Sequence, residues 1–597
     1  MTTNGHRIRL LALLLVGATF ATTQTAAAGR AGDAARAAPR LRALGPVRVR
    51  DLAVRARSAL SPRARGRDGI ARHLEHARPH HRAPRPGGEV AVPIPDRAVA
   101  RVTHGHGGVM SFDGIDHADQ RIARDGNQYT KEPPDGALCA GDGVIVQMVN
   151  AALQFSSTGG VLLSPPIALT SLWGLPPEVD RTRTPPTFPG PTLGDVKCVV
   201  DPGTNRLFLL AWGRGQNPTT GGFNGENTFF VAVSASSDLL GGYHRYAISA
   251  SAPSSPGCPC EADHPTIATD ASTLVVTYNE FASASGTLNG AKLLVMSKAK
   301  LEAGAVSPVA SLDAGQLGGG PLYTLQGGNV PAGGRYETAG GGTLWFVSAL
   351  EFTGEPDTRI ALEALTNTSS IDTDPSAIRL LKVIVPGVLP YVVPPSAAQR
   401  PGPRPLGEAV GEPLPRLDSG SDETQPTKFA AGRLWTVIDT QVGSGRSARA
   451  GLLYLQVAPT LGDGSISGRV VRQGYLAIRN GSLLYGDVAV NAAGKALIVT
   501  SIVGPRIHPS AAYGLLRPGS GVGEFRIYRE GMRPQDGATC YRAFVGKQAT
   551  ERGCRWGDYS EATVGGDGAF WFETEYVTSR LRTSLANWGT AIGRVPG

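Results

Sequence analysis

A tight turn followed by a short apolar run recurs seven times between residues 133 and 597. Each turn is built from Gly, Asp, Ala, Ser, Pro or Asn, which are the residues that turns favour. Recurrence at a roughly fixed spacing indicates a repeat architecture. The apolar runs begin near Val144, Leu207, Leu274, Leu344, Leu434, Ala496 and Phe570.

The spacing of these runs fits small antiparallel sheets. Successive runs begin 62 to 74 residues apart, except for one gap of 90 residues after Leu344. The Pro-rich residues 385–426 account for that gap, and we predict a loop there because proline cannot donate to a β-ladder. Later runs such as Thr228–Val233 supply the further strands of each unit. Helical periodicity is nearly absent, and Ser297–Ala303 is predicted as one short helix.

This pattern predicts an all-β fold, a β-propeller of seven four-stranded blades, over residues 105–597. A propeller must join its first and last blades. The segment Gly107–Phe112 precedes the first unit and has no blade of its own, so we expect it to complete the last blade. A linear β-solenoid is the alternative, but its repeats are normally shorter than about 40 residues.

The N-terminal hundred residues lack the repeat. A basic start, the apolar run Leu10–Ala21 and the small residues that end at Ala28 predict a secretory signal peptide, residues 1–28. An uncleaved membrane anchor is the alternative, but the apolar run is short for a bilayer span. Residues 29–104 hold few large apolar side chains and predict a disordered segment rich in Ala, Arg and Pro.

The net charge of +9 comes from this N-terminal region. Residues 29–100 contain 16 Arg and 6 acidic residues, so the repeat region is slightly acidic. The basic segment is either a solvated linker or a contact for an anionic cell surface. Nucleic acid is not expected as a partner because no aromatic side chains interleave the arginines. No later stretch is apolar enough to span a membrane once the signal peptide is cleaved.

The six cysteines predict disulfides in a secreted chain. Cys540 and Cys554 lie at the two ends of a short loop, and we predict that they form a disulfide. Closing such a loop stabilises a fold by roughly 3 kcal/mol in the chain-entropy model. Cys139 and Cys198 occupy similar places in adjacent repeats and would pair across neighbouring strands. The Cys-Pro-Cys motif at 258–260 is then either a local bridge or a pair of free thiols.

An acidic residue recurs just before the first strand of several units, and a propeller would gather these residues near one mouth of its channel. Such carboxylates would bind Ca²⁺, which prefers oxygen ligands, or two of them would act as acid and base on a glycosidic bond. The alternative is a structural Asp that caps a turn, which the recurrence favours. The candidates are Asp135, Asp195, Asp263, Asp487 and Asp558.

A second acidic cluster precedes the first unit. Asp113, Asp116 and Asp119 are candidate Ca²⁺ ligands, although they lack the spacing of an EF-hand loop. Histidines in the same region would complete a metal site with a carboxylate, or are exposed loop residues. These histidines are His104, His106 and His117.

Motifs for nucleophilic, zinc-dependent or phosphate chemistry are absent: no Gly-x-Ser-x-Gly, His-Glu-x-x-His or Gly-Lys-Ser/Thr sequence occurs. Trp345, Trp435 and Trp571 fall at equivalent strand positions, so we expect them in the cores of the blades. Aromatic residues outside this pattern are candidates for stacking on a ligand. They are Trp173, Trp212, Tyr243 and Tyr391.

The sequences Arg555–Ser560 (Arg-Trp-Gly-Asp-Tyr-Ser) and Asn587–Thr590 (Asn-Trp-Gly-Thr) resemble motifs of uncharacterised secreted bacterial proteins with a propeller-like repeat domain. The resemblance covers roughly residues 105–597 and implies a secreted propeller without a known activity. Sialidase-like propellers are a more distant comparison, and their Ser-x-Asp-x-Gly-x-x-Trp and Phe-Arg-Ile-Pro motifs are absent. In those enzymes three arginines bind the substrate carboxylate. The candidates for such arginines in this chain are Arg335, Arg506 and Arg555.

Two functions are compatible with these observations. The first is a secreted binding or scaffold protein that recognises an extracellular glycan or protein through its loops. The alternative is an extracellular glycoside hydrolase or lyase that uses carboxylates at the channel mouth. Ca²⁺ is the cofactor that the sequence suggests.

Overall fold

The computed structural model describes residues 39–59, 99–105, 108–250, 255, 257–517, 519–546, 553–580 and 582–597. These residues belong to one unit, Ala38–Gly597. The predicted signal peptide, residues 1–28, lies outside them. None of the helices in the described part of the chain is long and apolar enough to cross a membrane.

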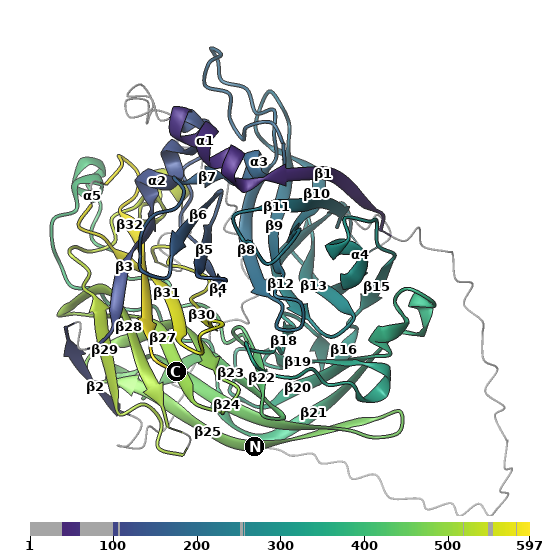
Figure 1. The fold of residues 1–597 in the computed structure, drawn as a ribbon. Helices are drawn as coiled ribbons and strands as arrows, with labels where there is room; N and C mark the ends of the chain where they lie inside the picture. Colours follow the sequence, from purple (N-terminus) through teal and green to yellow (C-terminus); the bar gives the residue numbers. More distant parts are fainter. Residues whose placement is uncertain are drawn as a thin grey trace, which may run out of the picture. The chain divides into compact units, whose positions relative to one another are not determined.

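The fold is all-β and propeller-like, with antiparallel sheets placed around a common centre (Figure 1). One sheet contains β4 (Ala137–Gly141), β5 (Val144–Val149), β6 (Ala152–Ser157) and β7 (Ile167–Ala168). The next contains β8 (Thr192–Val200), β9 (Leu207–Gln216), β10 (Phe223–Ser234) and β11 (Gly242–Ser249). It is followed by β12 (Cys260–Thr269), β13 (Thr273–Ala282), β14 (Leu288–Ser297) and β15 (Val309–Asp313). The fourth has β18 (Gln326–Gly327), β19 (Thr343–Ala349), β20 (Asp357–Thr366) and β21 (Arg379–Tyr391), after the small hairpin of β16 (Gln316–Leu317) and β17 (Gly320–Pro321).

A nine-stranded sheet follows. Its first half contains β22 (Lys428–Ala430), β23 (Arg433–Val442), β24 (Arg449–Leu461) and β25 (Ile466–Ile478). Its second half contains β26 (Ser482–Val490), β27 (Ala496–Gly504), β28 (Ile507–Leu516) and β29 (Glu524–Arg529). The strand β2 (Val99–His104) joins the halves, because it pairs in parallel with β25 through Val99 and Ala100 and with β29 through Arg101–His104.

The last sheet closes the ring. It contains β30 (Glu561–Val564), β31 (Phe570–Val577), β32 (Trp588–Val595) and β3 (Met110–Asp116). The strand β3 comes from the start of the repeat region and pairs antiparallel with β32, so that Met110 faces Arg594 and Phe112 faces Ile592. The predicted closure of the last sheet by the segment around Phe112 is therefore confirmed.

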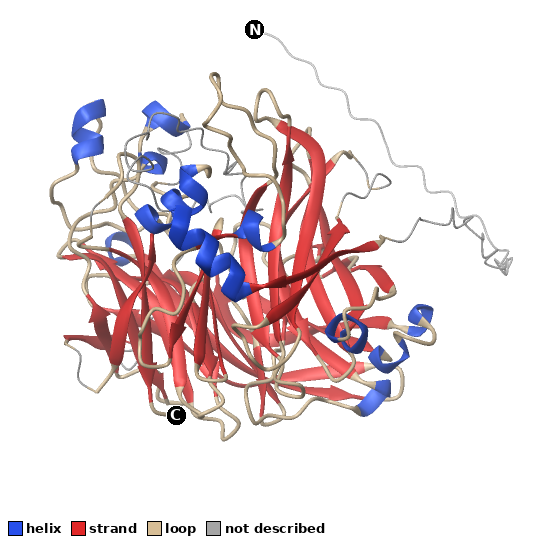
Figure 2. Ribbon diagram, turned by 45° about the horizontal axis from the view of Figure 1, so that its top comes forward, coloured by secondary structure: helices blue, strands red, loops and turns tan. Residues whose placement is uncertain are grey.

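Helices are few and lie in the segments between strands (Figure 2). The predicted short helix is confirmed as α4 (Lys298–Glu302). The other α-helices of the described residues are α1 (Val49–Ala59), α2 (His117–Ile122), α3 (Leu169–Leu172), α5 (Pro405–Val410) and α6 (Arg542–Val545).

Part of the segment 29–104, which we expected to be disordered, is ordered. The strand β1 (Leu41–Arg48) adds to the outer edge of β11, and α1 and β2 follow it. The buried side chains of Val49 and Leu52 explain the difference, because they pack into the core beside β4–β7. The remainder of the segment lies outside the described residues.

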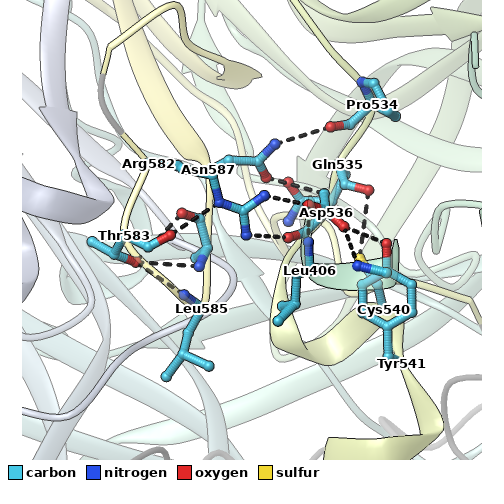
Figure 3. A network of polar contacts seen from close by, with 12 residues as sticks. Leu406, Pro534, Gln535, Asp536, Cys540, Tyr541, Arg582, Thr583, Leu585 and Asn587 are labelled. Carbon is cyan, nitrogen blue, oxygen red and sulfur yellow. Dashed lines mark hydrogen bonds and ion pairs between the residues drawn. The ribbon is translucent and has the colours of Figure 1, made fainter. Parts of the chain in front are cut away.

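The Pro-rich region 385–426 also contains regular structure. The strand β21 continues to Tyr391, and α5 forms further along. A buried carboxylate, Asp536, fixes the start of α5, because its two oxygens accept hydrogen bonds from the backbone N–H groups of Leu406 and Gly407 at 2.9 Å each. Arg582 and Tyr541 donate to the same carboxylate (Figure 3). The insert is therefore held by a polar network that hydrophobic patterning does not reveal.

All six cysteines are paired, as Cys139–Cys198, Cys258–Cys260 and Cys540–Cys554. The first bridge links β4 to β8 and so ties two neighbouring sheets together. The predicted core aromatics Trp345, Trp435 and Trp571 are buried.

We predict that Gly593→Ala destabilises the ring at its closing sheet. A Cβ at this position in β32 would collide with the ring of Phe572 on β31. Overpacking of this kind should lower the free energy of unfolding by about 1–3 kcal/mol, measured by urea denaturation. Gly566→Ala is the matched control, because a Cβ there meets no atom within 4 Å. Equal unfolding midpoints for the two variants would contradict the close packing of β32 on β31.

Candidate functional site

The first strand of each sheet faces the centre of the ring. Neighbouring first strands contact one another in the order β4, β8, β12 and β18, and again in the order β22, β26, β30 and β4. Asn329 supplies the remaining link, because it pairs in parallel with Lys428 at the start of β22. The side chains that these strands turn inward therefore line a common channel.

Irregular backbone on the inner strands determines which side chains point inward. Asp195 on β8, His264 on β12 and Tyr485 on β26 adopt the left-handed conformation, with φ of 48°, 49° and 50°. The register of the ladder shifts at the same places. A β-bulge of this kind re-aims the residues that follow it, here Lys197 on β8 and Asp487 on β26.

A cavity of about 250 Å³ lies at one end of the channel, and we call it the chamber. Apolar residues of several inner strands form much of its wall, together with the Cys139–Cys198 bridge. Lys428, Glu561 and Asp142 contribute charged groups to the lining. Neutral polar groups come from Asn205, Ser237, Asn329 and Thr563. Apolar walls with a few placed polar groups are typical of small-molecule sites.

The charges beside the chamber are paired. Lys428 Nζ lies 3.0 Å from Glu561 Oε1 and 3.4 Å from Asp487 Oδ2. Burial alone would lower the pKa of Lys428, but these two carboxylates outweigh it and raise the pKa to about 12. Asp487 also accepts hydrogen bonds from the N–H groups of Val488 and Ala562 at 2.7 and 2.6 Å. The ammonium group is therefore permanently charged and held in place.

A second polar layer connects the first and last sheets of the ring. Asp135 accepts hydrogen bonds from Asn150 Nδ2 at 2.7 Å and from the N–H of Asp558 at 2.8 Å. Asn150 Oδ1 in turn accepts from the N–H of Asp195, and Arg555 pairs with Asp558 at 2.6 Å. Burial raises the pKa of Asp135 to about 7, and the carboxylates of Asp558 and Asp195 add to this shift.

Lys197, Tyr559 and His264 occupy the space between these layers. Lys197 Nζ lies 2.8 Å from the centroid of the Tyr559 ring, and His264 meets the same ring edge-on at 4.8 Å between centroids. Burial lowers the pKa of Lys197 to about 8, against the opposing effect of nearby carboxylates, Glu561 first. The Lys197 ammonium and the Tyr559 hydroxyl are buried without a hydrogen-bond partner among the described residues. Cation–π attraction to the Tyr559 ring partly offsets the free-energy cost of burying the Lys197 charge.

The structure brings most of the predicted acidic residues into the channel, where they differ in burial. Asp135, Asp487 and Asp558 are buried, whereas Asp195 and Asp263 are half-buried. Asp135 accepts a hydrogen bond from the N–H of Asp558, and Asp487 accepts from those of Val488 and Ala562. Asp558 and Ala562 belong to the last part of the chain, so these two carboxylates connect distant segments rather than cap their own turns. Among the described residues these aspartates form no group of three ligand atoms close enough to hold one metal ion.

The candidate arginines and aromatic residues lie in different environments. Arg335 and Arg506 are exposed, whereas Arg555 is buried, so only Arg555 belongs to the channel. The candidate stacking residues are largely core residues. Trp173 packs on Phe230, Trp212 donates to Asn227, Tyr243 donates to the Leu239 carbonyl, and Tyr391 is fully buried and donates to the Arg359 carbonyl.

Guanidinium groups lie among the acidic residues of β3 and α2. Arg580 Nη1 is 3.1 Å from both Asp116 and Asp119, and Arg529 Nε is 3.2 Å from Asp113. Among the candidate histidines, His104 pairs with Glu530, His117 bonds to Thr583, and His106 lies outside the described residues. These arginines supply the positive charge that a bound Ca²⁺ would otherwise provide.

Sequence reasoning missed Lys197, Lys428 and Glu561, and it noted Tyr559 only as part of the motif Arg555–Ser560. The only signal for Lys197 is its place two residues after Asp195, where a bulge turns it inward. Lys428 and Glu561 open the inner strands of their sheets, which could be recognised only once the strand boundaries were known.

No protein-family model matches the chain, and no curated protein matches it. Solved structures that are similar include a fungal alcohol oxidase of the AA5 family in complex with copper, with TM-score 0.33, 10% identity, and coverage of 85% of this chain and 75% of that chain. Others are polysaccharide lyase Uly1 (TM-score 0.31, 10% identity, coverage 82% and 97%) and a mutant of the NanB sialidase from Streptococcus pneumoniae (TM-score 0.31, 11% identity, coverage 81% and 70%). Likenesses at this level say nothing about the chemistry of the channel.

We predict that the protein resists unfolding better near pH 5.5 than near pH 8.5. Burial raises the pKa of Asp135 to about 7 and those of Asp439 and Glu573 to about 8, whereas carboxyls in an unfolded chain titrate near pH 4. Their contribution to stability is complete below about pH 4 and is lost as the pH rises through about 7–8. His117, whose pKa burial lowers to about 3, opposes this trend only below about pH 6.5.

Thermal unfolding at constant ionic strength across this pH range measures the effect. Glu573→Gln carries a permanently neutral side chain and should reduce the pH dependence of the melting temperature. A melting temperature that rises from about pH 5.5 to about pH 8.5 would refute the prediction.

Proposed function

We propose that this protein is a secreted, seven-bladed β-propeller that binds a small polar group of an extracellular glycan or protein in the chamber. The number of blades follows if the nine-stranded sheet is counted as two, since only the parallel strand β2 joins its halves. Five further sheets of four or five strands then complete a ring of seven. Secretion is supported by the apolar leader at residues 1–28 and by three disulfides, which persist in oxidising compartments.

The chamber is the observation that carries the binding function. Its volume of about 250 Å³ lies just below the range of about 300–1,000 Å³ usual for ligand pockets. A single sugar residue or one protruding side chain is therefore a suitable occupant. The fixed charges of Lys428 and Glu561 would orient the hydroxyl or charged groups of such a ligand.

Binding fits the channel better than catalysis does. A glycoside hydrolase needs two carboxyl groups about 5–10 Å apart beside a site that admits substrate. Here Asp135 and Asp487 are buried and accept hydrogen bonds from the backbone, and Glu561 holds Lys428. These carboxylates are engaged in holding the channel together.

A substitution that fills the chamber tests this proposal. Thr563 lies on the same face of β30 as Glu561 and lines the cavity, so Thr563→Trp should occupy the space of the ligand. We expect wild-type protein to bind at least one ligand in a panel of glycans and peptides, and Thr563→Trp to weaken that binding by tenfold or more. Isothermal titration calorimetry, with and without Ca²⁺, measures the affinity.

Thr219→Trp is the matched control, because Thr219 lies in an exposed loop and adds the same bulk elsewhere. Binding that survives Thr563→Trp would exclude the chamber as the site. The same panel is assayed for hydrolysis, and turnover lost in Asp195→Asn or Asp558→Asn with folding intact would favour the hydrolase or lyase instead.

A further inference from the structure

A separate site lies at the start of β12, outside the chamber. Cys258 and Cys260 are bridged there, and the carboxylate of Glu280 on β13 lies beside them. One ligand atom from each of the three residues lies within 4.8 Å of the others. Among the described residues no other group of Cys, His, Asp or Glu side chains meets this condition.

The Cys258–Cys260 bridge is the most accessible of the three disulfides. Cys258 is half-buried between the exposed residues Gly257 and Pro259. The four cysteines of the other two bridges are at most 8% exposed. A reductant therefore reaches this bridge first.

The bridge also contributes least to holding the fold. It closes a loop with a sequence separation of 2, against 14 and 59 for the other two disulfides. In the chain-entropy model the stabilisation grows with loop length, so opening this bridge costs the protein least. Its reduction is compatible with an intact ring.

The carboxylate of Glu280 is buried and only partly satisfied by hydrogen bonds. Its side chain is 1% exposed, and its Oε2 has no hydrogen-bond partner among the described residues. Its Oε1 accepts a hydrogen bond from Asn289 Nδ2 at 3.4 Å and lies 3.8 Å from Lys292 Nζ. A buried carboxylate oxygen without a partner is costly, and a cation bound beside it would remove that cost.

We propose that reduction of the Cys258–Cys260 disulfide creates a binding site for one thiophilic divalent metal ion such as Zn²⁺, with Glu280 as the third ligand. A dithiol reductant supplies two electrons and two protons, becomes a disulfide itself and leaves two thiols. The metal then displaces the two thiol protons and binds both thiolates and the carboxylate. Cys258 is half-buried, so solvent could supply a fourth ligand from its side. Asn289 also donates to Cys260 Sγ at 3.4 Å, which favours the thiolate.

The first experiment tests the order of reduction. The full chain is treated with limiting dithiothreitol, free thiols are alkylated, and the modified peptides are identified by mass spectrometry. We expect Cys258 and Cys260 to be alkylated first while the melting temperature stays close to that of the oxidised protein. Earlier labelling of Cys540 or Cys139 would overturn the proposal.

The second experiment titrates the selectively reduced chain with Co²⁺, whose bonds to thiolates give a charge-transfer absorbance, and then displaces it with Zn²⁺. We expect one Co²⁺ per chain, no signal from the oxidised protein or from Cys258→Ser, and binding weakened by about tenfold or more in Glu280→Gln. Glu355→Gln, at an exposed carboxylate, is the matched control. Absence of the signal in the reduced wild type, or equal affinity in Glu280→Gln, would overturn the site.

Discussion

The pairing of β3 with β32 is the interaction on which the rest of the structure depends. A ring of sheets leaves no exposed end only when its first and last members are joined, and here main-chain hydrogen bonds between residues more than 450 positions apart make that join. The Cys139–Cys198 bridge reinforces the same region by linking the two sheets that follow β3. Because closure fixes the position of every inner strand, it also fixes which side chains meet in the channel.

Closure has an electrostatic consequence. The inner strands carry Lys197, Lys428, Asp487 and Glu561 into a place with little water, where unpaired charges are expensive. The structure compensates them with each other, with backbone N–H groups and with the Tyr559 ring. Burial still raises the pKa of Asp487 and Asp135 to about 7 and that of Glu573 to about 8, so these carboxyls stay protonated to higher pH than exposed ones. The centre of the ring is therefore sensitive to pH.

The repeat, the closing segment around Phe112 and the helix α4 could be predicted from the sequence, because they depend on local patterns of turns and apolar runs. No comparable local pattern predicts that β1 and α1 are ordered. Their few apolar residues gain stability only by contact with strands near residues 137–249, a tertiary effect. The same holds for the Pro-rich insert, which Asp536 fixes from more than 120 residues away.

The channel shows most clearly where prediction from sequence ends. The recurrent aspartates were recognised because they repeat. Residues that repeat in several blades are expected to have a structural role within each blade. Lys428 and Glu561 occur once each, so no pattern marks them, yet closure places them 3.0 Å apart beside the chamber. Specific recognition needs such an asymmetric arrangement, because a ring of equivalent groups could not orient a ligand. Lys428, with Glu561 and the repeated position Asp487 as its two partners, therefore breaks the symmetry of the ring beside the chamber.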